Sequence, residues 1–435
     1  MRSSRKKNLP DTLYLCIWSI IVCIVSCILY GVITHKDEND KNQKNNVVEE
    51  SEPQDKPFSG NNIYTYIELL EMPAETAFQN IRVMITNKKN NSIFFELDDY
   101  EHVRSELEAE GYRGQLIFQK ATDESDGFVV INELPLEEYL YGVVPSEMPA
   151  GYPMEALKAQ AICARTYAVI HMMNPAYPDY NAHVNDTTSF QVYHNIEEQA
   201  STNRAVDETA GLLLFEDNGE ELAETFYYST SCGQTCEAST NVEFKEYITK
   251  IYSSDVEAEE SWYRWTCNVK DIDENNMLTR MRARYKVNSG KLLTMTGKDT
   301  FESLPINELE SIKELFISKR GDGGVSEELI ITTKKNTYKV VGEYNIRYVL
   351  NDPDTVIKKQ DGSETNMSTL LPSAFISLEA VKSKDTVVGY QIIGGGYGHG
   401  VGMSQNGAKG MANLGYSAEE ILGYFFPGSR ILGNL

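Results

Sequence analysis

Residues 13–33 carry no charged side chain and read LYLCIWSIIVCIVSCILYGVI. A helix rises about 1.5 Å per residue, so one helix of this length crosses the hydrocarbon core of a bilayer. Four basic side chains lie in the preceding segment, residues 1–12, and flanks rich in lysine and arginine stay in the cytoplasm. We therefore expect a single-pass type II membrane protein, with a basic cytoplasmic tail over residues 1–12 and the chain after Thr34 outside the cell.

Cleavage and lipidation are the alternatives to a permanent anchor. Residues 33–36 lack the small side chains of a signal-peptidase site, which argues against cleavage. Residues 24–27 resemble a bacterial lipobox, which keeps lipidation of Cys27 as an alternative, although the chain stays apolar for six residues beyond it. Residues 34–60 are polar, rich in Asn, Glu and Lys, and are expected to form a flexible linker.

The composition excludes two classes of protein. The 435 residues include 40 Lys and Arg against 64 Asp and Glu, a formal net charge of −24. Such an acidic chain is not expected to bind the phosphate backbone of a nucleic acid. The seven cysteines are too few for a scaffold built on disulfides, so packed apolar cores must hold the fold.

The hydrophobic pattern after residue 60 predicts an α+β fold. Alternating apolar residues predict short antiparallel strands across residues 61–131. An Ala-rich helix with an acidic first turn is predicted after Pro153, over MEALKAQAICARTYAVIHMM. Strands at 211–215 and 224–229 flank an Asp-Asn-Gly turn, a strong hairpin signal. Further predicted elements are a helix within 262–288, strands at 312–318, 329–333, 338–341 and 389–393, and helices at 344–350, 404–414 and 417–425.

Glu147 is the first candidate for chemistry. It lies in the sequence Pro-Ser-Glu-Met-Pro between two predicted helices, where nearby prolines restrict the backbone. A glutamate in a loop is usually only solvated, so the local sequence does not by itself assign a catalytic role.

The neighbourhood of Glu147 is more specific. Residues 134–149 read LPLEEYLYGVVPSEMP, followed by EALKAQA at 155–161 and ARTYA at 164–168. Later blocks are DTT at 186–188, QVY at 191–193, YSTSCGQT at 228–235, KRGDGGV at 319–325, GGGYGHGVGMSQNGA at 394–408 and FFPG at 425–428. In order and spacing these blocks cover about residues 63–435, and together they resemble the stage II sporulation protein D (SpoIID/LytB) family.

The resemblance implies a lytic transglycosylase that cleaves peptidoglycan glycan strands, with Glu147 as the single general acid/base. A glycosidase normally uses two carboxylates. Here the O6 hydroxyl of muramic acid replaces the second by attacking C1 of its own ring, so a 1,6-anhydro product forms without water. Met148, Tyr152 and Tyr141 are the neighbours expected to raise the pKa of Glu147.

Candidate substrate-binding residues come from the same blocks, because amides and hydroxyls bond sugar hydroxyls and aromatic rings stack on sugar faces. They are Ser146, Arg165, Gln191, Tyr193, Ser229, Ser231, His399, Ser404 and Gln405. Structural alternatives stay open: Arg165 in structural pairing, which is favoured, His399 as a cap of its loop, and Ser404 as the N-cap of a helix. Ordinary strand surface is an equal alternative for Gln191, Tyr193, Ser229 and Ser231.

The expected organisation after the linker is one SpoIID/LytB-like region, residues 61–435, mixed α/β and two-lobed with a groove. Its parts are a β-rich segment at 61–131, a catalytic core at 132–260, an α/β insertion lobe at 261–385, and a C-terminal Gly-rich loop with helices at 386–435. The resemblance implies septal wall remodelling during engulfment in a spore former. Glycan strands are then the substrate, and a cell-wall amidase and other membrane-anchored sporulation proteins are the partners.

No cofactor is expected, and zinc is not favoured. Some relatives bind zinc through Cys, His and Cys around the DTT block, where this chain has Asn185, Ser189 and Phe190. Cys232 and Cys236 are spaced by three residues, and for this pair a disulfide is favoured over free thiols.

Two further histidines and a second function stay open as alternatives. A metal at the cysteine pair would need His183 or His194 as an additional ligand. The alternative function is a non-catalytic glycan-binding protein that enhances a cell-wall amidase, in which Glu147 is only a groove residue.

Overall fold

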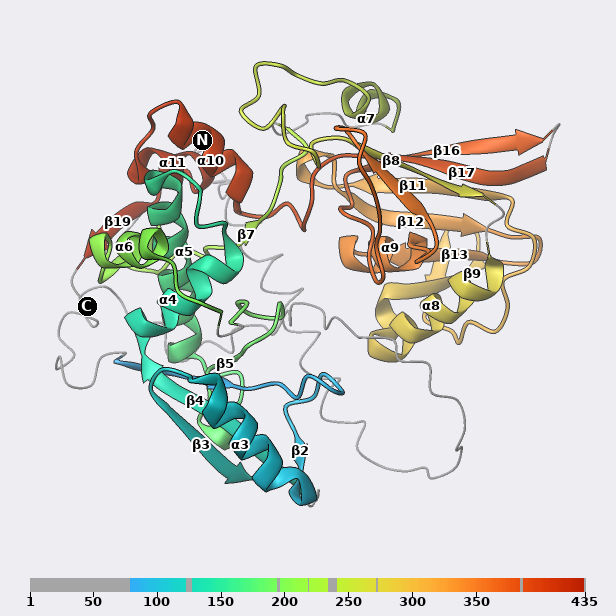
Figure 1. The fold of residues 1–435 in the computed structure, drawn as a ribbon. Helices are drawn as coiled ribbons and strands as arrows, with labels where there is room; N and C mark the ends of the chain where they lie inside the picture. The colour runs from blue at the N-terminus through green and yellow to red at the C-terminus, as the bar shows by residue number, and fades with distance from the viewer. Residues whose placement is uncertain are drawn as a thin grey trace, which may run out of the picture. The chain divides into compact units, whose positions relative to one another are not determined.

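The computed structural model describes residues 79–122, 127–193, 196–217, 219–233, 241–270, 273–383 and 386–433 (Figure 1). The expected membrane helix at 13–33, Cys27 and the linker at 34–60 lie outside these residues. Within the described part of the chain, no helix combines the length and the hydropathy needed to span a membrane. The described residues divide into unit 1, with residues 79–143 and 168–196, and unit 2, with residues 144–167 and 197–433.

Unit 1 is built on a sheet whose central strand is β4 (Gly127–Pro135). The other strands are β1 (Asn80–Met84), β2 (Phe95–Glu96), β3 (Gln115–Lys120) and β5 (Val184–Asn185). β1, β2 and β3 pair antiparallel with β4, and β5 runs parallel to β1. The predicted antiparallel strands of this segment are confirmed for the residues described.

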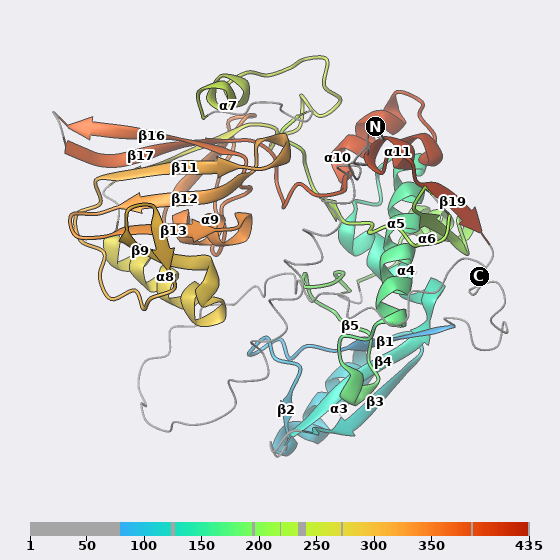
Figure 2. The ribbon, with the colours of Figure 1, turned by 180° about the vertical axis from the view of Figure 1, so that it is seen from behind.

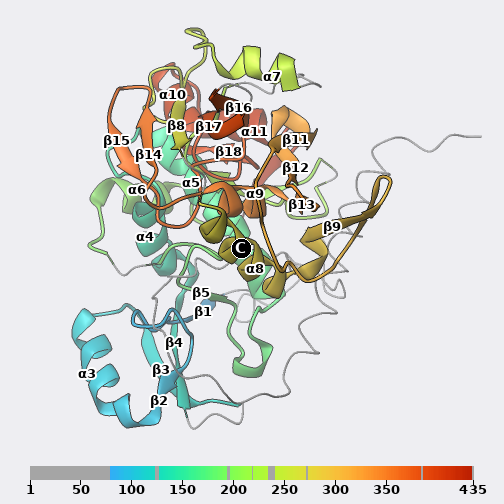
Figure 3. The ribbon, with the colours of Figure 1, turned by 90° about the vertical axis from the view of Figure 1, so that its right-hand side faces the viewer.

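Successive side chains of a strand point to opposite faces of its sheet. In β4 the side chains on both faces are buried. Phe128 and Val130 pack in one cluster with Val103 and Leu107 of helix α3 (Tyr100–Glu110), and Figure 3 shows this helix alongside β2, β3 and β4. The alternate residues of β4 pack against the loop that carries Tyr180. Helix α3 was not predicted from the sequence.

Unit 2 holds most of the strands and helices. One sheet has the order β10-β9-β13-β12-β11 and a second has the order β15-β14-β8-β17-β16, while β18 pairs with β7 and β19 with β6. Figures 1 and 2 show β11, β12 and β13 side by side, and β16 beside β17. The strands are β6 (Leu212–Phe215), β7 (Tyr227–Tyr228), β8 (Trp265–Lys270), β9 (Leu292–Gly297), β10 (Thr300–Glu302), β11 (Glu314–Arg320), β12 (Ser326–Thr332), β13 (Thr337–Val341), β14 (Val356–Lys359), β15 (Glu364–Asn366), β16 (Ile376–Ser383), β17 (Thr386–Gly394), β18 (Met403–Ser404) and β19 (Arg430–Gly433).

The remaining helices complete an α+β fold, as the sequence predicts. They are α4 (Leu136–Glu147), α5 (Met154–Met173), α6 (Ala200–Glu208), α7 (Asn241–Ile248), α8 (Glu274–Val287), α9 (Glu343–Leu350), α10 (Gln405–Asn413) and α11 (Ala418–Phe425). The boundary between the units falls within α4 and again within α5.

Separate cores hold the parts of unit 2. The strands of the two larger sheets share a cluster with α8 and α9 that includes Trp265, Met281, Leu329 and Ile346. Helices α5, α10 and α11 pack around a second cluster with Leu157, Met403, Ala408 and Ile421. Full burial of one such aliphatic side chain stabilises the fold by about 1.5–3 kcal/mol.

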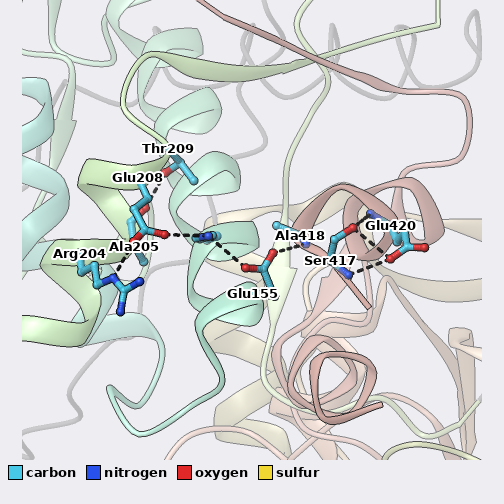
Figure 4. A network of polar contacts seen from close by, with 9 residues as sticks. Glu155, Arg204, Ala205, Glu208, Thr209, Ser417, Ala418 and Glu420 are labelled. Carbon is cyan, nitrogen blue, oxygen red and sulfur yellow. Dashed lines mark hydrogen bonds and ion pairs between the residues drawn. The ribbon is translucent and has the colours of Figure 1, made fainter. Parts of the chain in front are cut away.

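Polar contacts also join the helices around the second cluster (Figure 4). The Lys158 ammonium group of α5 lies 3.0 Å from Glu155 and 2.8 Å from Glu208 of α6. The other carboxylate oxygen of Glu155 accepts a hydrogen bond of 2.9 Å from the amide of Ala418, at the start of α11. A carboxylate at this end also complements the dipole of α11, whose first turn is closed by a capping box between Ser417 and Glu420.

Two predicted elements differ in the structure. Residues 265–270 form strand β8 instead of the start of a helix, and the helix begins at Glu274 after its N-cap, Asp273. The expected hairpin turns back only as far as a bridge between Phe215 and Leu222. Beyond it β6 pairs with β19, and β7 pairs in parallel with β18.

Candidate active site

Glu147 is the last residue of helix α4, which continues through Pro145. The expectation that Glu147 lies in the bend between two helices is therefore corrected. Glu147 lies at the end of the first helix, one residue before the bend, which begins at Met148. The Tyr152 amide donates to the carbonyl of Pro149, and the amides of the first turn of α5 donate to the carbonyl of Pro153. The Glu147 side chain is half-buried, and its charge adds to burial in raising the pKa of Tyr167 on α5.

The backbone of Glu147 is held by residues 394–408, which we call the C-terminal block. The Gln405 side-chain nitrogen donates to the Glu147 carbonyl oxygen at 3.0 Å and lies 3.4 Å from the side-chain oxygen of Gln160. Gln405 and Gln160 are both buried. Residues 258 positions apart in the chain thus meet at the candidate acid.

Asn406, the next residue of α10, links the serine-rich strand and turn, residues 228–233, to the bend at residues 148–153. Its amide donates to the Ser229 carbonyl, and its side-chain nitrogen donates to the Thr230 hydroxyl at 2.9 Å. Its side-chain oxygen accepts a hydrogen bond of 2.5 Å from the Tyr152 hydroxyl. Ser229 is half-buried, and its hydroxyl oxygen lies 3.2 Å from that of Thr230.

Ser404 is the N-cap of α10, because its hydroxyl oxygen accepts from the Gly407 amide. The same hydroxyl donates to the carboxylate of Glu257 at 2.6 Å. Ser231 forms a tight turn with Gly233, and the Ser231 amide donates to the same Glu257 oxygen at 2.9 Å. The structural alternative for Ser404 is thus realised in this geometry.

The Glu257 carboxyl group is 4% exposed. Burial raises its pKa to about 7, while the hydrogen bonds from Ser404 and Ser231 lower it and the charges of Asp255 and Glu260 add to the increase. A carboxyl group with this pKa is partly protonated at neutral pH.

His399 caps its own loop. Its Nδ1 accepts from the Val401 amide at 3.1 Å, and its Nε2 lies 3.1 Å from the Tyr227 carbonyl. Because a carbonyl only accepts, the ring is the neutral Nε2–H tautomer, in agreement with burial that lowers the His399 pKa to about 4. With both ring nitrogens engaged, the ring presents only its carbon edge and its face.

A line of aromatic rings connects this histidine to the surroundings of Glu147. The ring of Phe226 lies 6.2 Å from that of Tyr167 and 6.4 Å from that of His399, both in edge-on contact. The Tyr228 ring lies 5.6 Å from His399 on the other side. Phe226 is 38% exposed, so an aromatic surface faces solvent next to Tyr167, whose pKa the charge of Glu147 helps to raise.

The other predicted residues lie elsewhere. Arg165 is fully buried and donates to the carbonyls of Val206 and Leu212 and toward the Thr209 hydroxyl, which is a structural arrangement. Gln191 and Tyr193 belong to unit 1, where Gln191 accepts from Tyr139.

Tyr193 packs inside unit 1 as a core residue. Its hydroxyl donates to Asn132, and its ring lies 5.1 Å from that of Tyr139. Tyr141 is also in unit 1, beneath the guanidinium of Arg113, and Ser146 is half-buried near the end of α4.

The DTT block forms a turn. The Asn185 side-chain oxygen accepts from the amide and the hydroxyl of Thr187, and its nitrogen donates to Tyr177. These contacts use the polar atoms of Asn185 locally, so the residues present do not fit the zinc site of some relatives. Among the described residues no group of three or more His, Cys, Asp or Glu side chains is placed to hold a metal ion.

The cysteine pair is only partly described. Cys232 is buried, whereas Cys236 and His194 lie outside the described residues, so the disulfide stays a prediction. His183 is described, with its pKa lowered to about 4 by burial first and by the nearby charge of Arg82 second.

Sequence reasoning missed Gln160, Phe226 and Glu257. Gln160 lies within the EALKAQA block among several polar residues of the same helix, and its burial is visible only in the structure. Glu257 lies in the run DVEAEE, which has the composition of a solvated surface. No local signal separates it from its acidic neighbours.

Comparison with known proteins identifies the family. The family model of the stage II sporulation protein SpoIID matches residues 124–215. The amidase enhancer of Bacillus subtilis is 30% identical over 304 residues, which cover 67% of this chain but only 40% of that protein. An uncharacterised protein of Brachyspira hyodysenteriae is 31% identical over 74% of this chain and 72% of its own length.

The stage II sporulation protein D of Bacillus subtilis is 28% identical over 316 residues, 69% of this chain and 75% of that protein. The segment that the family model matches includes Glu147. The chain therefore belongs to the SpoIID family of stage II sporulation proteins.

Proposed function

We propose that this chain is a membrane-anchored lytic transglycosylase of peptidoglycan, with Glu147 as its general acid and base. One observation carries the proposal. Glu147 ends helix α4, and its carbonyl accepts a hydrogen bond from Gln405 of the C-terminal block. Two blocks that resemble the same family, far apart in sequence, thus meet at the one residue that the chemistry requires.

The chemistry needs a single proton carrier. The Glu147 carboxylic acid donates its proton to the glycosidic oxygen as the bond to C1 of muramic acid breaks. The resulting carboxylate then accepts the proton of the O6 hydroxyl as O6 bonds to C1 of the same ring. The proton returns to Glu147, and the products are a 1,6-anhydromuramyl end and a free hydroxyl on the leaving sugar. Intramolecular attack makes a second carboxylate unnecessary.

The surface beside Glu147 suits a sugar chain. Phe226 is exposed and contacts both Tyr167 and His399. Aromatic rings present apolar faces to the C–H faces of pyranose rings. Phe226 is therefore assigned as a stacking residue for the glycan strand.

The site of action is proposed from the sequence. Residues 13–33 would anchor the chain, with the SpoIID-like region outside the membrane, in the cell wall or the septal intermembrane space. Sporulation is the setting that the stage II sporulation relatives favour. A cell-wall amidase and other membrane-anchored sporulation proteins are the proposed partners.

Mass spectrometry of digested glycan strands tests the reaction. The full chain, purified in detergent, is incubated with strands that carry or lack stem peptides. The parent is expected to release anhydromuramyl products, and Glu147→Gln to reduce the rate at least about 100-fold, since general acid–base catalysis contributes on the order of 100- to 10,000-fold. Glu138→Gln is the matched control, because it makes the same change on the same helix at a carboxylate paired with Arg113.

Three outcomes separate the possibilities. Loss of anhydro product in Glu147→Gln alone supports the proposal. Reducing ends without the anhydro ring would mean a hydrolase. Complete absence of cleavage by the parent on both substrates would overturn the enzymatic proposal.

Amidase enhancement is the second candidate, and it is favoured by the 30% identical relative named amidase enhancer. A non-catalytic member would bind glycan and stimulate a wall amidase equally well as the parent or as Glu147→Gln. Stimulation by both proteins, with anhydro product from neither, would decide for this function.

A further inference from the structure

Glu257 is a buried carboxyl group outside the blocks that resemble the family. It lies in the segment between α7 and β8 and is 4% exposed. Burying a carboxyl group costs several kcal/mol unless hydrogen bonds compensate, so its placement calls for a structural reason. Its contacts supply one.

The carboxyl group joins two segments that are far apart in sequence. One oxygen accepts from the Ser404 hydroxyl at 2.6 Å and from the Ser231 amide at 2.9 Å. The first contact spans 147 positions of the chain and the second spans 26. The Glu257 carboxyl group therefore ties the serine-rich turn to the start of α10.

The start of α10 in turn holds the backbone around Glu147. Gln405 donates to the Glu147 carbonyl at 3.0 Å, and Asn406 accepts from Tyr152 at 2.5 Å. These residues follow Ser404 directly in the chain. A shift of Ser404 would displace both contacts, one at each end of the bend from Met148 to Pro153.

The carboxyl group of Glu257 is closely packed against Gly407 of α10. A side chain at Gly407 would place its Cβ 3.1 Å from the second Glu257 oxygen and 2.8 Å from Phe425. The charges near the group are Asp255 and Glu260, which repel it, and Lys409 pairs with Glu260 at 2.7 Å. Tyr152 and Tyr228 also lie within its electrostatic reach.

We propose that Glu257 is a positioning residue for Glu147, acting through Ser404 and the first turn of α10. The proposal deepens the proposed function and rests on it for the effect on catalysis. The effect on backbone order around Glu147 does not depend on any activity.

Three variants of the full chain in detergent test the proposal. Glu257→Leu fills a similar volume but cannot accept hydrogen bonds, whereas Glu257→Gln retains an oxygen that accepts from both donors. Glu259→Leu is the matched control, since it makes the same change at an exposed carboxylate of the same segment. Hydrogen–deuterium exchange of residues 144–152 and 404–408 is measured, together with kcat and KM on glycan strands.

In Glu257→Leu, exchange in both segments is expected to rise at least fivefold and kcat to fall at least tenfold, with KM within a factor of two. Glu257→Gln is expected to keep kcat within threefold of the parent, and Glu259→Leu is expected to have the kcat of the parent. Exchange in the sheet segment 356–366 serves as the folding reference. If Glu257→Leu does not fold, Ser404→Ala removes the same link from the other side, and the same local exchange is expected.

Unchanged exchange at 144–152 in a folded Glu257→Leu protein would overturn the proposal. Equal loss of activity in Glu257→Gln and Glu257→Leu would also overturn it, because then the charge and not the hydrogen bonds would matter. If the parent makes no anhydro product, the proposed function fails, yet the exchange result still decides whether Glu257 positions this backbone.

Discussion

Phe226 and Phe316 are phenylalanines of nearly equal exposure, 38% and 39%, in different settings. Phe226 contacts Tyr167 and His399, whereas Phe316 lies on β11 of a sheet without a proposed role in catalysis. If Phe226 stacks on the glycan strand, Phe226→Leu should raise KM about fivefold, the size expected for one aromatic contact, and should change kcat little. The measurement is the rate of anhydro product formation against strand concentration.

Phe316→Leu is the control for this prediction, because it removes the same ring from a similarly exposed position. It should leave KM unchanged, and both variants should unfold within a few degrees of the parent. A KM that rises equally in both variants, or in neither, would contradict the assignment of Phe226.

At the residue scale, Glu147 and Gln405 became candidates through the resemblance of their sequence blocks to the family, because local pattern alone assigns neither a role. Ser404 could be predicted as an N-cap from its place before a predicted helix, and the structure confirms that cap. Glu257 could not be found, since its burial depends on Ser231 and Ser404, which reach it only in the folded chain.

At the element scale, local pattern succeeded where one residue type dominates. Helix α5 follows the Ala-rich sequence from its first turn. Strand β8 was predicted as helix because its six residues, WTCNVK, alternate too briefly to outweigh the strongly helical residues that follow. Helix α3 was missed because its sequence, YEHVRSELEAE, is polar apart from Val103 and Leu107, which pack on β4.

The glycine-rich loop before β18 is an element that the sequence indicates but whose tightness only the structure shows. Gly402 has φ +76°, and a Cβ there would lie 2.0 Å from the Phe226 carbonyl oxygen. Gly415 also has a positive φ, +92°, but nothing lies within 4 Å of its Cβ position. Gly402→Ala should therefore cost at least about 3 kcal/mol of unfolding free energy.

Gly415→Ala isolates the backbone strain and should cost only about 1–2 kcal/mol. Urea unfolding of both variants and the parent measures the difference. Equal losses would mean that the loop around Gly402 yields to a methyl group, and that its close contact with Phe226 does not constrain the site.

At the scale of the whole molecule, chain order does not predict which residues belong together. Strand β7 pairs with β18, about 175 positions later, because the serine-rich strand and the C-terminal block share one site. Helices α4 and α5 each contribute residues to both units. Composition and periodicity carry no information on such pairings, since these depend on packing between distant segments.

Stability against pH is also a property of the whole chain, and 64 acidic residues contribute to it. The contribution of one group is isolated by comparing the parent with Glu257→Gln, because the other carboxylates are common to both proteins. Folding raises the Glu257 pKa from 4.5 to about 7, mainly through burial. The folded state therefore binds more protons than the unfolded state between these values, and stability falls as pH rises through that window.

The parent should lose about 3 kcal/mol relative to Glu257→Gln between pH 4.5 and pH 7, since one pKa unit corresponds to about 1.4 kcal/mol. The difference should become constant only about one unit above the folded-state pKa, because Glu257 is then ionised in both states. Urea unfolding at half-unit steps of pH measures it, and Glu259→Gln, at an exposed carboxylate of the same segment that does not act on Glu257, should run parallel to the parent. Parallel curves for the parent and Glu257→Gln would mean that water reaches Glu257, in which case its hydrogen bonds to Ser231 and Ser404 could not hold Glu147 in place.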